Sequence, residues 1–362
     1  MSPGGTTTDA EPVRMQATRL LDRFAAVARP GPWKAPMVHH HVGGRHGFRL
    51  VVGVCVHGDE VGPLPAAVEL VEELRAGTED YGGILTIFVG NPAAVQAGRR
   101  LMDSDLNRVF LPSPPDDREG RRALALQPIL AQADLFLDLH QTGTPTAEAF
   151  YTLPWRELDG AWARALAGAR LWMTRPWGQV FSTGTCCADE YVRALGPPAL
   201  TLELSEKGLR PETEAEASRV LRRLLRLAED HASGRRDIHQ AAREQPELEF
   251  MHEVLREPFG DPRRALRPGL SNLASVRAGD LLSPPGAIEV RSPIDGLLVF
   301  PKYPSRDSHG RARSPVPAEI FRIATPLPDH PRTLWGEGGL AADLAEGGAA
   351  EPANGAEAAR AP

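Results

Sequence analysis

Two histidines and one glutamate in this chain stand where strand-like apolar runs end. The run at residues 50–56 is followed by His57-Gly-Asp-Glu60, and the run at residues 135–139 is followed by His140. Two imidazoles and a carboxylate suit a catalytic zinc ion, which keeps a fourth position open for water. A His-x-x-Glu pattern alone is common by chance. The placement of both histidines at strand ends is what favours a metal site.

Two further carboxylates lie on runs of the same kind. Asp138 lies two residues before His140, on the same strand face, and could orient that histidine as a hydrogen-bond partner. The alternation in Thr201-Leu-Glu203-Leu-Ser205 places the two leucines on one face and Thr201, Glu203 and Ser205 on the other. A carboxylate at a strand end beside a metal-bound water can serve as a general base. Without the metal ligands, Glu203 would be interpreted as an exposed strand residue.

A polar segment at residues 91–108, NPAAVQAGRRLMDSDLNR, follows the strand-like run at 84–89. Open α/β sheets place ligand sites at such strand ends. Arginine side chains bind carboxylates through two parallel hydrogen bonds, which favours an anionic substrate, although a solvated surface loop is the alternative. The segment also begins like a calcium loop, but Arg108 and Pro114 stand where an EF-hand needs Gly and Glu.

The elements that would position these residues alternate between strands and helices, which predicts an α/β domain with a largely parallel sheet over residues 15–240. The expected strands are 48–56, 84–89, 135–140 and 200–204, and the expected helices are 63–75, 117–132, 155–169, 189–195 and 212–231. Short alternating segments broken by Gly and Pro predict a smaller all-β domain at 246–330, after a polar linker at 233–247. Residues 1–14 and 336–362 are expected to be disordered tails.

The composition excludes several classes of protein. The 362 residues carry a net charge of −6, with 42% apolar and 24% charged residues, as in a soluble globular protein. The chain has no excess of positive charge that would attract nucleic acid. No apolar run approaches the ~20 residues that span a membrane, and the N-terminus lacks a signal-peptide pattern. We therefore expect a cytoplasmic protein with no nucleic-acid or membrane partner.

The cysteines and the histidine-rich tract carry weaker signals. Cys55 is expected to be a small core residue, and Cys186-Cys187 to be two ordinary thiols, with a vicinal redox pair as the alternative. The tract His39-His40-His41, with His46 nearby, is expected to be exposed in a turn region before the first core strand.

Four segments together resemble the succinylglutamate desuccinylase/aspartoacylase family, whose catalytic domain is related to the zinc carboxypeptidases. They are, in order, His57-Gly-Asp-Glu60, Asn91-Pro through Asp105-Leu-Asn107-Arg108, Asp138-Leu-His140 and Leu202-Glu203-Leu204. The resemblance covers residues 48–235 and, more weakly, the chain to about residue 326. It implies a zinc carboxypeptidase-like mixed, mostly parallel sheet flanked by helices, with a smaller C-terminal all-β domain.

The resemblance also implies a role for each matching residue. The zinc ligands, for one Zn²⁺ per chain, would be His57, Glu60 and His140. Glu203 would be the general acid/base, and Arg100 would polarise the scissile carbonyl and stabilise the oxyanion. The substrate would be held by four residues, which are Asn107, Arg108, Arg193 and, from the β domain, Tyr303. Three residues depart from the family pattern, namely Asp59 in place of the usual Asn, Leu101 in place of an aromatic residue and Ser205 in place of Gly. These departures leave the identity of the substrate open.

The sequence therefore predicts a zinc-dependent amidohydrolase that removes the acyl group of an N-acylated amino acid or a similar small amide. One alternative is a carboxypeptidase-like peptidase acting on short peptides, and another is a non-catalytic metal- or ligand-binding protein of the same fold. The β domain could also serve mainly as an interaction module. The acyl group, the amine and a homo-oligomeric state are left open.

Overall fold

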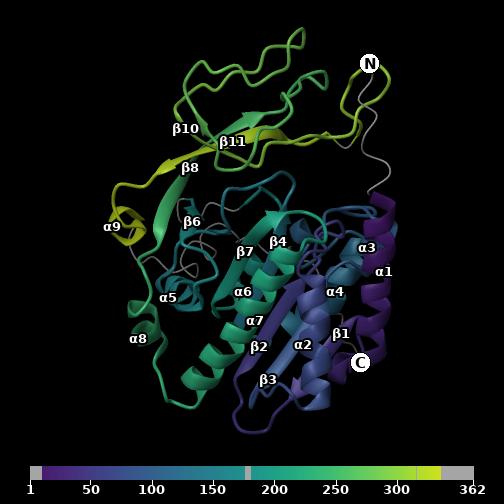
Figure 1. The fold of residues 1–362 in the computed structure, drawn as a ribbon, viewed down its shortest axis with the longest axis vertical. Coiled ribbons are helices and arrows are strands. Elements are labelled where there is room, and N and C mark those ends of the chain that lie inside the picture. Colours follow the sequence, from purple (N-terminus) through teal and green to yellow (C-terminus); the bar gives the residue numbers. More distant parts are fainter. Residues whose placement is uncertain (1–9, 176–180, 315, 336–362) are drawn as a thin grey trace, which may run out of the picture.

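The computed structural model describes residues 10–175, 181–314 and 316–335. Within them, the strands form one eleven-stranded sheet in the order β1-β3-β2-β4-β7-β5-β6-β8-β11-β10-β9 (Figure 1). The strands are β1 (Val38–Val42), β2 (Arg49–Val54), β3 (Ile84–Val89), β4 (Leu135–Thr142), β5 (Phe150–Thr152), β6 (Leu171–Thr174), β7 (Ala199–Glu206), β8 (Glu249–Pro258), β9 (Ser275–Val276), β10 (Gly296–Val299) and β11 (Glu319–Pro326).

The helices lie between the strands and pack on the sheet. The α-helices are α1 (Ala10–Val27), α2 (Leu64–Ala76), α3 (Pro92–Ala97), α4 (Arg118–Leu130), α5 (Glu157–Leu166), α6 (Ala188–Ala194), α7 (Pro211–Ala232), α8 (Ile238–Arg243) and α9 (Pro331–Trp335). Two 3₁₀ turns, η1 (Gly31–Trp33) and η2 (Leu106–Arg108), complete the order. No helix among the described residues is long and apolar enough to cross a membrane.

The centre of the sheet is parallel. The strands β3, β2, β4 and β7 pair in parallel, as do β5, β6 and β8, whereas β1 and β3, and β5 and β7, are antiparallel. The strands β2 and β4 are continuous apolar runs because parallel strands in the middle of a sheet are buried on both faces. The predicted mixed, mostly parallel sheet flanked by helices is confirmed.

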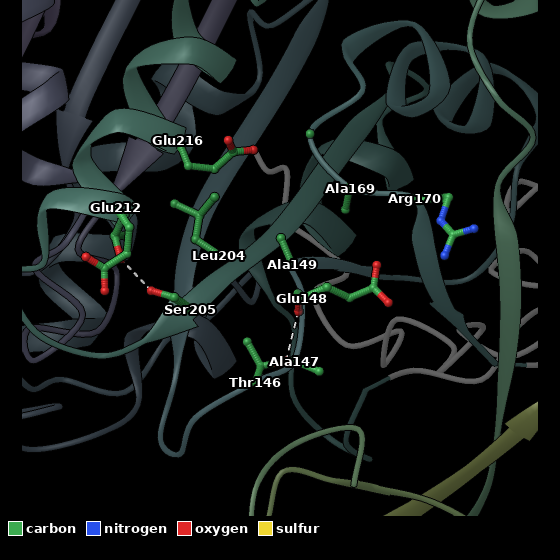
Figure 2. Close-up of a pocket in the computed structure, with 12 residues that line it drawn as sticks. Thr146, Ala147, Glu148, Ala149, Ala169, Arg170, Leu204, Ser205, Glu212 and Glu216 are labelled. Carbon is green, nitrogen blue, oxygen red and sulfur yellow. Dashed lines mark hydrogen bonds between the residues drawn. The ribbon is translucent and has the colours of Figure 1, made fainter. Parts of the chain in front are cut away.

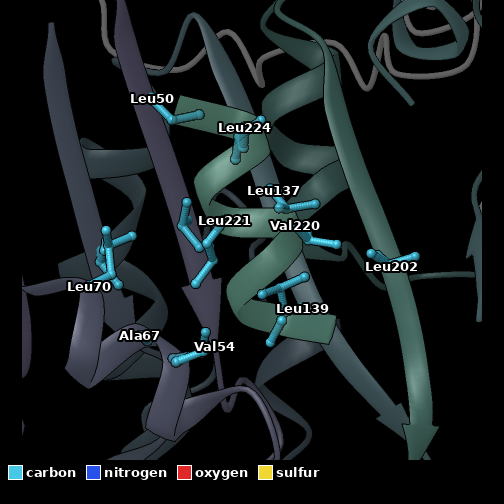
Figure 3. Close-up of a cluster of buried hydrophobic side chains, with 14 of the residues drawn as sticks. Leu50, Val54, Ala67, Leu70, Leu137, Leu139, Leu202, Val220, Leu221 and Leu224 are labelled. Atoms are coloured by element: carbon cyan, nitrogen blue, oxygen red, sulfur yellow. The ribbon is translucent and has the colours of Figure 1, made fainter. Parts of the chain in front are cut away.

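Helices cover both faces of this sheet. On one face, apolar side chains of β2, β4 and β7 pack against α2 and α7, and Figure 3 shows Leu137 and Leu139 facing Val220 and Leu224. On the other face, Phe136 packs with residues of α4 and α6. Because side chains alternate along a strand, the orientation of the two leucines directs the next residues, Asp138 and His140, to the opposite face.

The C-terminal strands continue the same sheet. The strand β8 pairs in parallel with β6 and antiparallel with β11, so the ladder passes without a gap from β1 to β9. A separate apolar cluster includes residues of these strands and of the loops between them, with Phe259, Leu298 and Phe321 among its buried members. A further cluster contains Phe150 of β5 and two residues of β6, which pack with residues of β8, β10 and β11. The division into domains at residues 240–246 stays a prediction.

Several local expectations differ from the structure. The helix α1 begins at Ala10, inside the segment predicted to be disordered, and α8 lies within the predicted linker. The exposed turn predicted for the histidine tract is wrong, because His39 is buried in β1, which pairs with β3. One nitrogen of each ring has a partner, since His39 Nδ1 accepts from Arg29 N at 3.3 Å and His40 Nδ1 lies 3.0 Å from Thr86 Oγ1, whereas the buried Nε2 of His39 has none among the described residues. Residues 1–9 and the predicted tail 336–362 lie outside the described residues.

Candidate active site

Three adjacent parallel strands bring the predicted site residues to one edge of the sheet. The strand β2 ends at Val54, and Cys55, with a φ of 53°, turns the chain toward His57. This left-handed conformation is uncommon for a residue with a side chain and marks a forced turn. In the neighbouring ladder His140 of β4 is the register partner of Glu203 of β7. The carboxyl ends of parallel strands meet at the same edge, where open α/β sheets bind ligands.

The three predicted metal ligands converge. His57 Nδ1 lies 2.7 Å from Glu60 Oε1, and His140 Nδ1 lies 2.8 Å from Glu60 Oε2. One potential ligand atom from each residue lies within 4.8 Å of the other two, and all three residues are buried. Two imidazole nitrogens and a carboxylate oxygen, gathered at the wall of a cavity, could hold a metal ion, and donors of this kind suit zinc.

The electrostatics of this group favour a cation. Burial acts to raise the pKa of Glu60, but His57 and His140 lower that pKa well below its ordinary value. Burial acts to lower the pKa of His140, but Asp138 and Glu60 raise it well above its ordinary value. The carboxylate of Glu60 is therefore held ionised between the two imidazole rings, and a metal ion that bound here would displace the protons that the rings carry.

Two aspartates contact the far side of the histidine rings. His57 Nε2 lies 3.0 Å from Asp105 Oδ1, and His140 Nε2 lies 2.9 Å from Asp138 Oδ2. The second contact has the distance of an ion pair without the alignment of a hydrogen bond. Such partners fix the ring orientation of metal-binding histidines. This role was predicted for Asp138 but missed for Asp105, whose signal is its place at the start of the Asp-Leu-Asn-Arg segment.

Glu203 and Arg100 complete the centre. Arg100 donates hydrogen bonds to Glu60 Oε1 at 3.0 Å and to Asp105 Oδ2 at 3.2 Å. Glu203 Oε2 is buried and has no hydrogen-bond partner among the described residues. Burial raises the pKa of Glu203 to about 7. A buried carboxyl group that titrates near neutrality suits general acid/base chemistry.

A cavity of about 480 Å³ opens beside these groups. It is lined by both halves of the chain, and its C-terminal wall includes Phe300, Lys302, Tyr303 and Arg322. Eight of the nine predicted site residues line it, and they are His57, Glu60, Arg100, Asn107, Arg108, His140, Glu203 and Tyr303.

Arg193 is the exception, because it is not among the residues that line this cavity. Its side chain is 2% exposed, lies 3.0 Å from a carboxylate oxygen of Asp159 and donates to Pro154 O at 2.7 Å. The helix α6 directs it toward α5 instead of toward the strand ends. Arg175, which directly follows β6, lines the cavity instead. Arg175 was not among the predicted residues because the four-residue strand β6 is too short to show a recognisable period in the sequence.

The predicted substrate-binding residues differ in their surroundings. Asn107 Oδ1 accepts a hydrogen bond from Ala188 N at 2.9 Å, which ties η2 to the start of α6. Arg108 lies over the Phe181 ring, 4.4 Å from its centroid, and in the described part of the chain no carboxylate oxygen lies within 4.0 Å of its guanidinium. Tyr303 is 44% exposed and donates its hydroxyl to Arg267 O at 2.8 Å. Its predicted role stays a prediction.

A second cavity, of about 400 Å³, lies near β7 but is lined by a different set of residues (Figure 2). Its wall includes Leu204 and Ser205 of β7 and Glu212 of α7. Ser205 was predicted to share the face of Glu203, but the β4–β7 register shifts after Glu203, which indicates a bulge. A bulge re-aims the residues that follow it. Ser205 Oγ lies 2.5 Å from Thr213 Oγ1 instead, and Ser205 does not line the cavity beside His57, Glu60 and His140.

Residues 46–231, just over half of the 362-residue chain, match the model of the Succinylglutamate desuccinylase/Aspartoacylase catalytic domain. The chain belongs to this family. The resemblance given by the four sequence segments is therefore confirmed.

The matching curated relatives include succinylglutamate desuccinylases. The protein of Serratia proteamaculans is 36% identical over 95 residues, which are 25% of this chain and 29% of the relative. The protein of Burkholderia lata is 38% identical over 81 residues, which are 22% of this chain and 23% of the relative. The chain thus matches only about a quarter of the length of these relatives.

Solved structures share the fold over most of the chain. A succinylglutamate desuccinylase from Vibrio parahaemolyticus superposes with a TM-score of 0.60 at 14% identity, covering 81% of this chain and 86% of that one. Murine aminoacylase 3 superposes with a TM-score of 0.56 at 18% identity, covering 77% and 95%. At these identities the likeness establishes the fold and leaves the substrate open.

Proposed function

We propose that this chain is a zinc-dependent amidohydrolase that removes the acyl group from an N-acylated amino acid or a similar small amide. One observation carries the proposal, namely that the Nδ1 atoms of His57 and His140 meet the two oxygens of Glu60 in the cavity that Glu203 lines. Membership of the succinylglutamate desuccinylase/aspartoacylase family supports it.

Zinc fits the donors of this site. His57, Glu60 and His140 would hold the ion through two imidazole nitrogens and a carboxylate, with a fourth position left for water. Bound zinc would supply a Lewis acid that lowers the pKa of water toward ~7 and polarises a carbonyl group.

The side chains of the cavity would carry the remaining steps. Glu203 accepts the proton of the attacking water and later delivers it to the nitrogen of the leaving amine, and a pKa near 7 suits both transfers. Arg100 donates to the carbonyl oxygen as negative charge develops there. Asn107 and Arg108 hold the carboxylate of the substrate, and the guanidinium fork of Arg108 fits a carboxylate geometrically.

The test is metal analysis of the purified protein, followed by an amine-release assay with N-succinyl, N-acetyl and N-formyl amino acids. We expect about one zinc ion per chain, and activity that is lost with a chelator and restored by zinc. A protein that keeps zinc but hydrolyses none of these amides would contradict the deacylase proposal.

The same assay separates the alternatives. Release of a C-terminal residue from short peptides, without hydrolysis of N-acyl amino acids, would favour the peptidase. A cavity of about 480 Å³ walled by both halves of the chain favours a small amide. A small-molecule substrate and a cytoplasmic location stay predictions, and the oligomeric state stays open.

A further inference from the structure

Two parts of the chain that are far apart in the sequence contribute to the wall of the large cavity. The first is the end of β4, where Thr142 and Gly143 closely follow His140. The second is the loop after β10, which contributes residues 300–304. The width of the cavity between His140 and this loop therefore depends on the contacts that join the two parts.

The buried side chain of Asn272 joins these two parts. Its Nδ2 donates hydrogen bonds to Thr144 Oγ1 at 2.9 Å and to Thr144 O at 3.3 Å. Its Oδ1 accepts a hydrogen bond from Phe300 N at 2.6 Å. Asn272 is 0% exposed, so the donors and the acceptor of its amide group are used away from water. Such bonds are costly to break, because a buried partner that loses its bond stays desolvated.

Further hydrogen bonds connect Asn272 with the cavity wall. Thr144 O also accepts a hydrogen bond from Thr142 Oγ1 at 2.6 Å, and the backbone N–H of Asn272 donates to Pro145 O at 2.8 Å. The contacts thus form a joint that passes from Thr142 in the cavity wall through Thr144 and Asn272 to Phe300, which lines the cavity as well.

Two residues next to Asn272 have a left-handed backbone. The φ angles of Leu273 and Phe300 are 64° and 49°, which residues with a side chain rarely adopt. Leu273 N donates to Leu298 O of β10 at 2.8 Å, and Phe300 N donates to Asn272, so hydrogen bonds hold both residues in place. Costly backbone conformations persist where the surrounding contacts impose them, and they gather at functional sites. The strain beside Asn272 indicates that the position of the loop after β10 matters for the site.

We propose that Asn272 is a positioning residue that fixes the loop after β10 relative to His140 and thereby sets the geometry of the substrate cavity. Asn272 and Thr144 do not line the cavity, so they act through Thr142 and Phe300, which do. This inference rests on the proposed function, because it assigns the cavity to a substrate.

The joint acts on the binding of substrate more than on the chemical step. A loop released from Asn272 has to be ordered again when the substrate binds, and this ordering weakens binding. The apparent affinity falls in proportion to the fraction of molecules in which the loop is in place. The groups proposed for the chemical step, Arg100 and Glu203, are outside the joint, on the loop after α3 and on β7. We therefore expect KM to rise while kcat changes little.

Three variants test the joint by kinetics. Asn272→Ala removes the three side-chain bonds, Thr144→Val removes only the hydroxyl acceptor, and Thr144→Ser keeps that acceptor. The substrate is the N-succinyl, N-acetyl or N-formyl amino acid that the wild type hydrolyses fastest. We expect KM to rise about tenfold in Asn272→Ala and about threefold in Thr144→Val, with kcat within about twofold of the wild type. Thr144→Ser should keep the wild-type KM.

Thr86→Val is the matched control. Thr86 is also buried, its Oγ1 lies 3.0 Å from His40 Nδ1, and it does not line the cavity. This variant loses a buried hydrogen bond of the same kind at a remote place, so KM should stay at the wild-type level. An equal rise of KM in Thr86→Val and Thr144→Val would overturn the inference, since any weakening of the fold would then produce it.

Hydrogen exchange measured by mass spectrometry tests the joint independently of activity. The segment 297–304 should exchange at least about fivefold faster in Asn272→Ala and Thr144→Val, because the Phe300 amide loses its fixed acceptor. The segment 135–141, in the centre of the sheet, should keep its wild-type rates. If Asn272→Ala does not fold, Thr144→Val decides alone.

The outcomes separate the joint from the proposed function. Unchanged exchange at 297–304 overturns the inference, and so does faster exchange without a rise in KM. Faster exchange of this segment, together with a wild type that hydrolyses none of these amides, supports the joint and contradicts the proposed function.

Discussion

The two cavities that share β7 in their walls differ in the burial of their charges more than in their size. Their volumes are about 480 and about 400 Å³, and both contain carboxylates. In the larger one Glu60 and Glu203 are buried among histidines and arginines, and their pKa values are displaced in opposite directions. In the smaller one Glu148 and Glu212 are exposed to solvent. Buried charges with oppositely shifted pKa values favour the larger cavity as the candidate active site, whereas volume alone would not separate the two cavities.

The most direct test of this comparison replaces one residue of β7 in the wall of each cavity. Glu203→Gln keeps the volume of the side chain but removes the proton acceptor, so we expect a loss of about 10²–10⁴-fold in kcat with about one zinc ion per chain retained. Ser205→Ala, in the smaller cavity, should change kcat by less than about twofold. Turnover and metal content are measured for both variants. Wild-type activity in Glu203→Gln would remove this residue from the mechanism.

A second pair of variants uses two neighbouring arginines. Arg100 contacts Glu60 and Asp105, whereas Arg99 is exposed and outside the cavity wall. Arg100→Met should lower kcat by about 10²–10³-fold because it removes the donor expected at the oxyanion. Arg99→Met should leave steady-state kinetics near the wild type. Equal losses in the two variants would mean that general positive charge, and not one directed donor, supports the reaction.

A third test concerns a buried carboxylate that lies outside both cavity walls. Glu119 is 1% exposed and accepts hydrogen bonds from Asn91 Nδ2 at 2.9 Å and from the backbone N–H groups of Met102, Asp103 and Ser104 at 2.7, 3.0 and 3.2 Å. These bonds anchor the loop that follows Arg100. In Glu119→Gln, the side-chain NH₂ group would face N–H donors that the carboxylate now accepts. These donors would lose their acceptor, which costs about 1–3 kcal/mol of stability.

We expect Glu119→Gln to lower kcat about tenfold with a smaller change in KM, since misplacement of a catalytic group acts mainly on the transition state. Kinetics and urea unfolding measure the two effects. Glu69→Gln, on the exposed side of α2, is the control. A change in stability without a change in kcat would show that the loop holds its geometry without this anchor.

The smallest expected effect is that of a charge cluster remote from both cavities. Burial acts to raise the pKa of Glu229, but hydrogen bonds from Arg45, Gly82 N and His46 lower that pKa to about 2. A lowered pKa stabilises the fold above the unfolded-state value of 4.5, and this contribution disappears as the pH falls toward about 2.

Glu229→Gln should therefore cost about 1 kcal/mol at pH 7, after allowance for partial exposure, and progressively less on acidification below about pH 4.5. Urea unfolding at several pH values measures this difference. Activity at pH 7 should stay at the wild-type level, because Glu229 touches neither cavity. A stability difference that grows on acidification would contradict the assigned sign.

Much of the candidate site could be predicted from the sequence because its signals are local. His57 and His140 follow long apolar strands, and a parallel sheet gathers such strand ends at one edge. Arg175 was missed because β6 is too short to show a period, and Lys302 because no local pattern indicates that its loop reaches the cavity. Arg193 was assigned from its position ten residues before Glu203, and such a position does not reveal whether the side chain reaches the cavity.

The strand β8 connects the C-terminal strands to the central part of the sheet. Because it is bonded on one side to β6 and on the other to β11, the wall that holds Lys302 is joined to the centre by a continuous ladder of backbone bonds. A chain truncated before β8 would leave β6 as an exposed edge strand, whose backbone groups could pair with other molecules. We expect such a fragment to aggregate. The C-terminal strands would therefore also prevent β6 from pairing with other molecules.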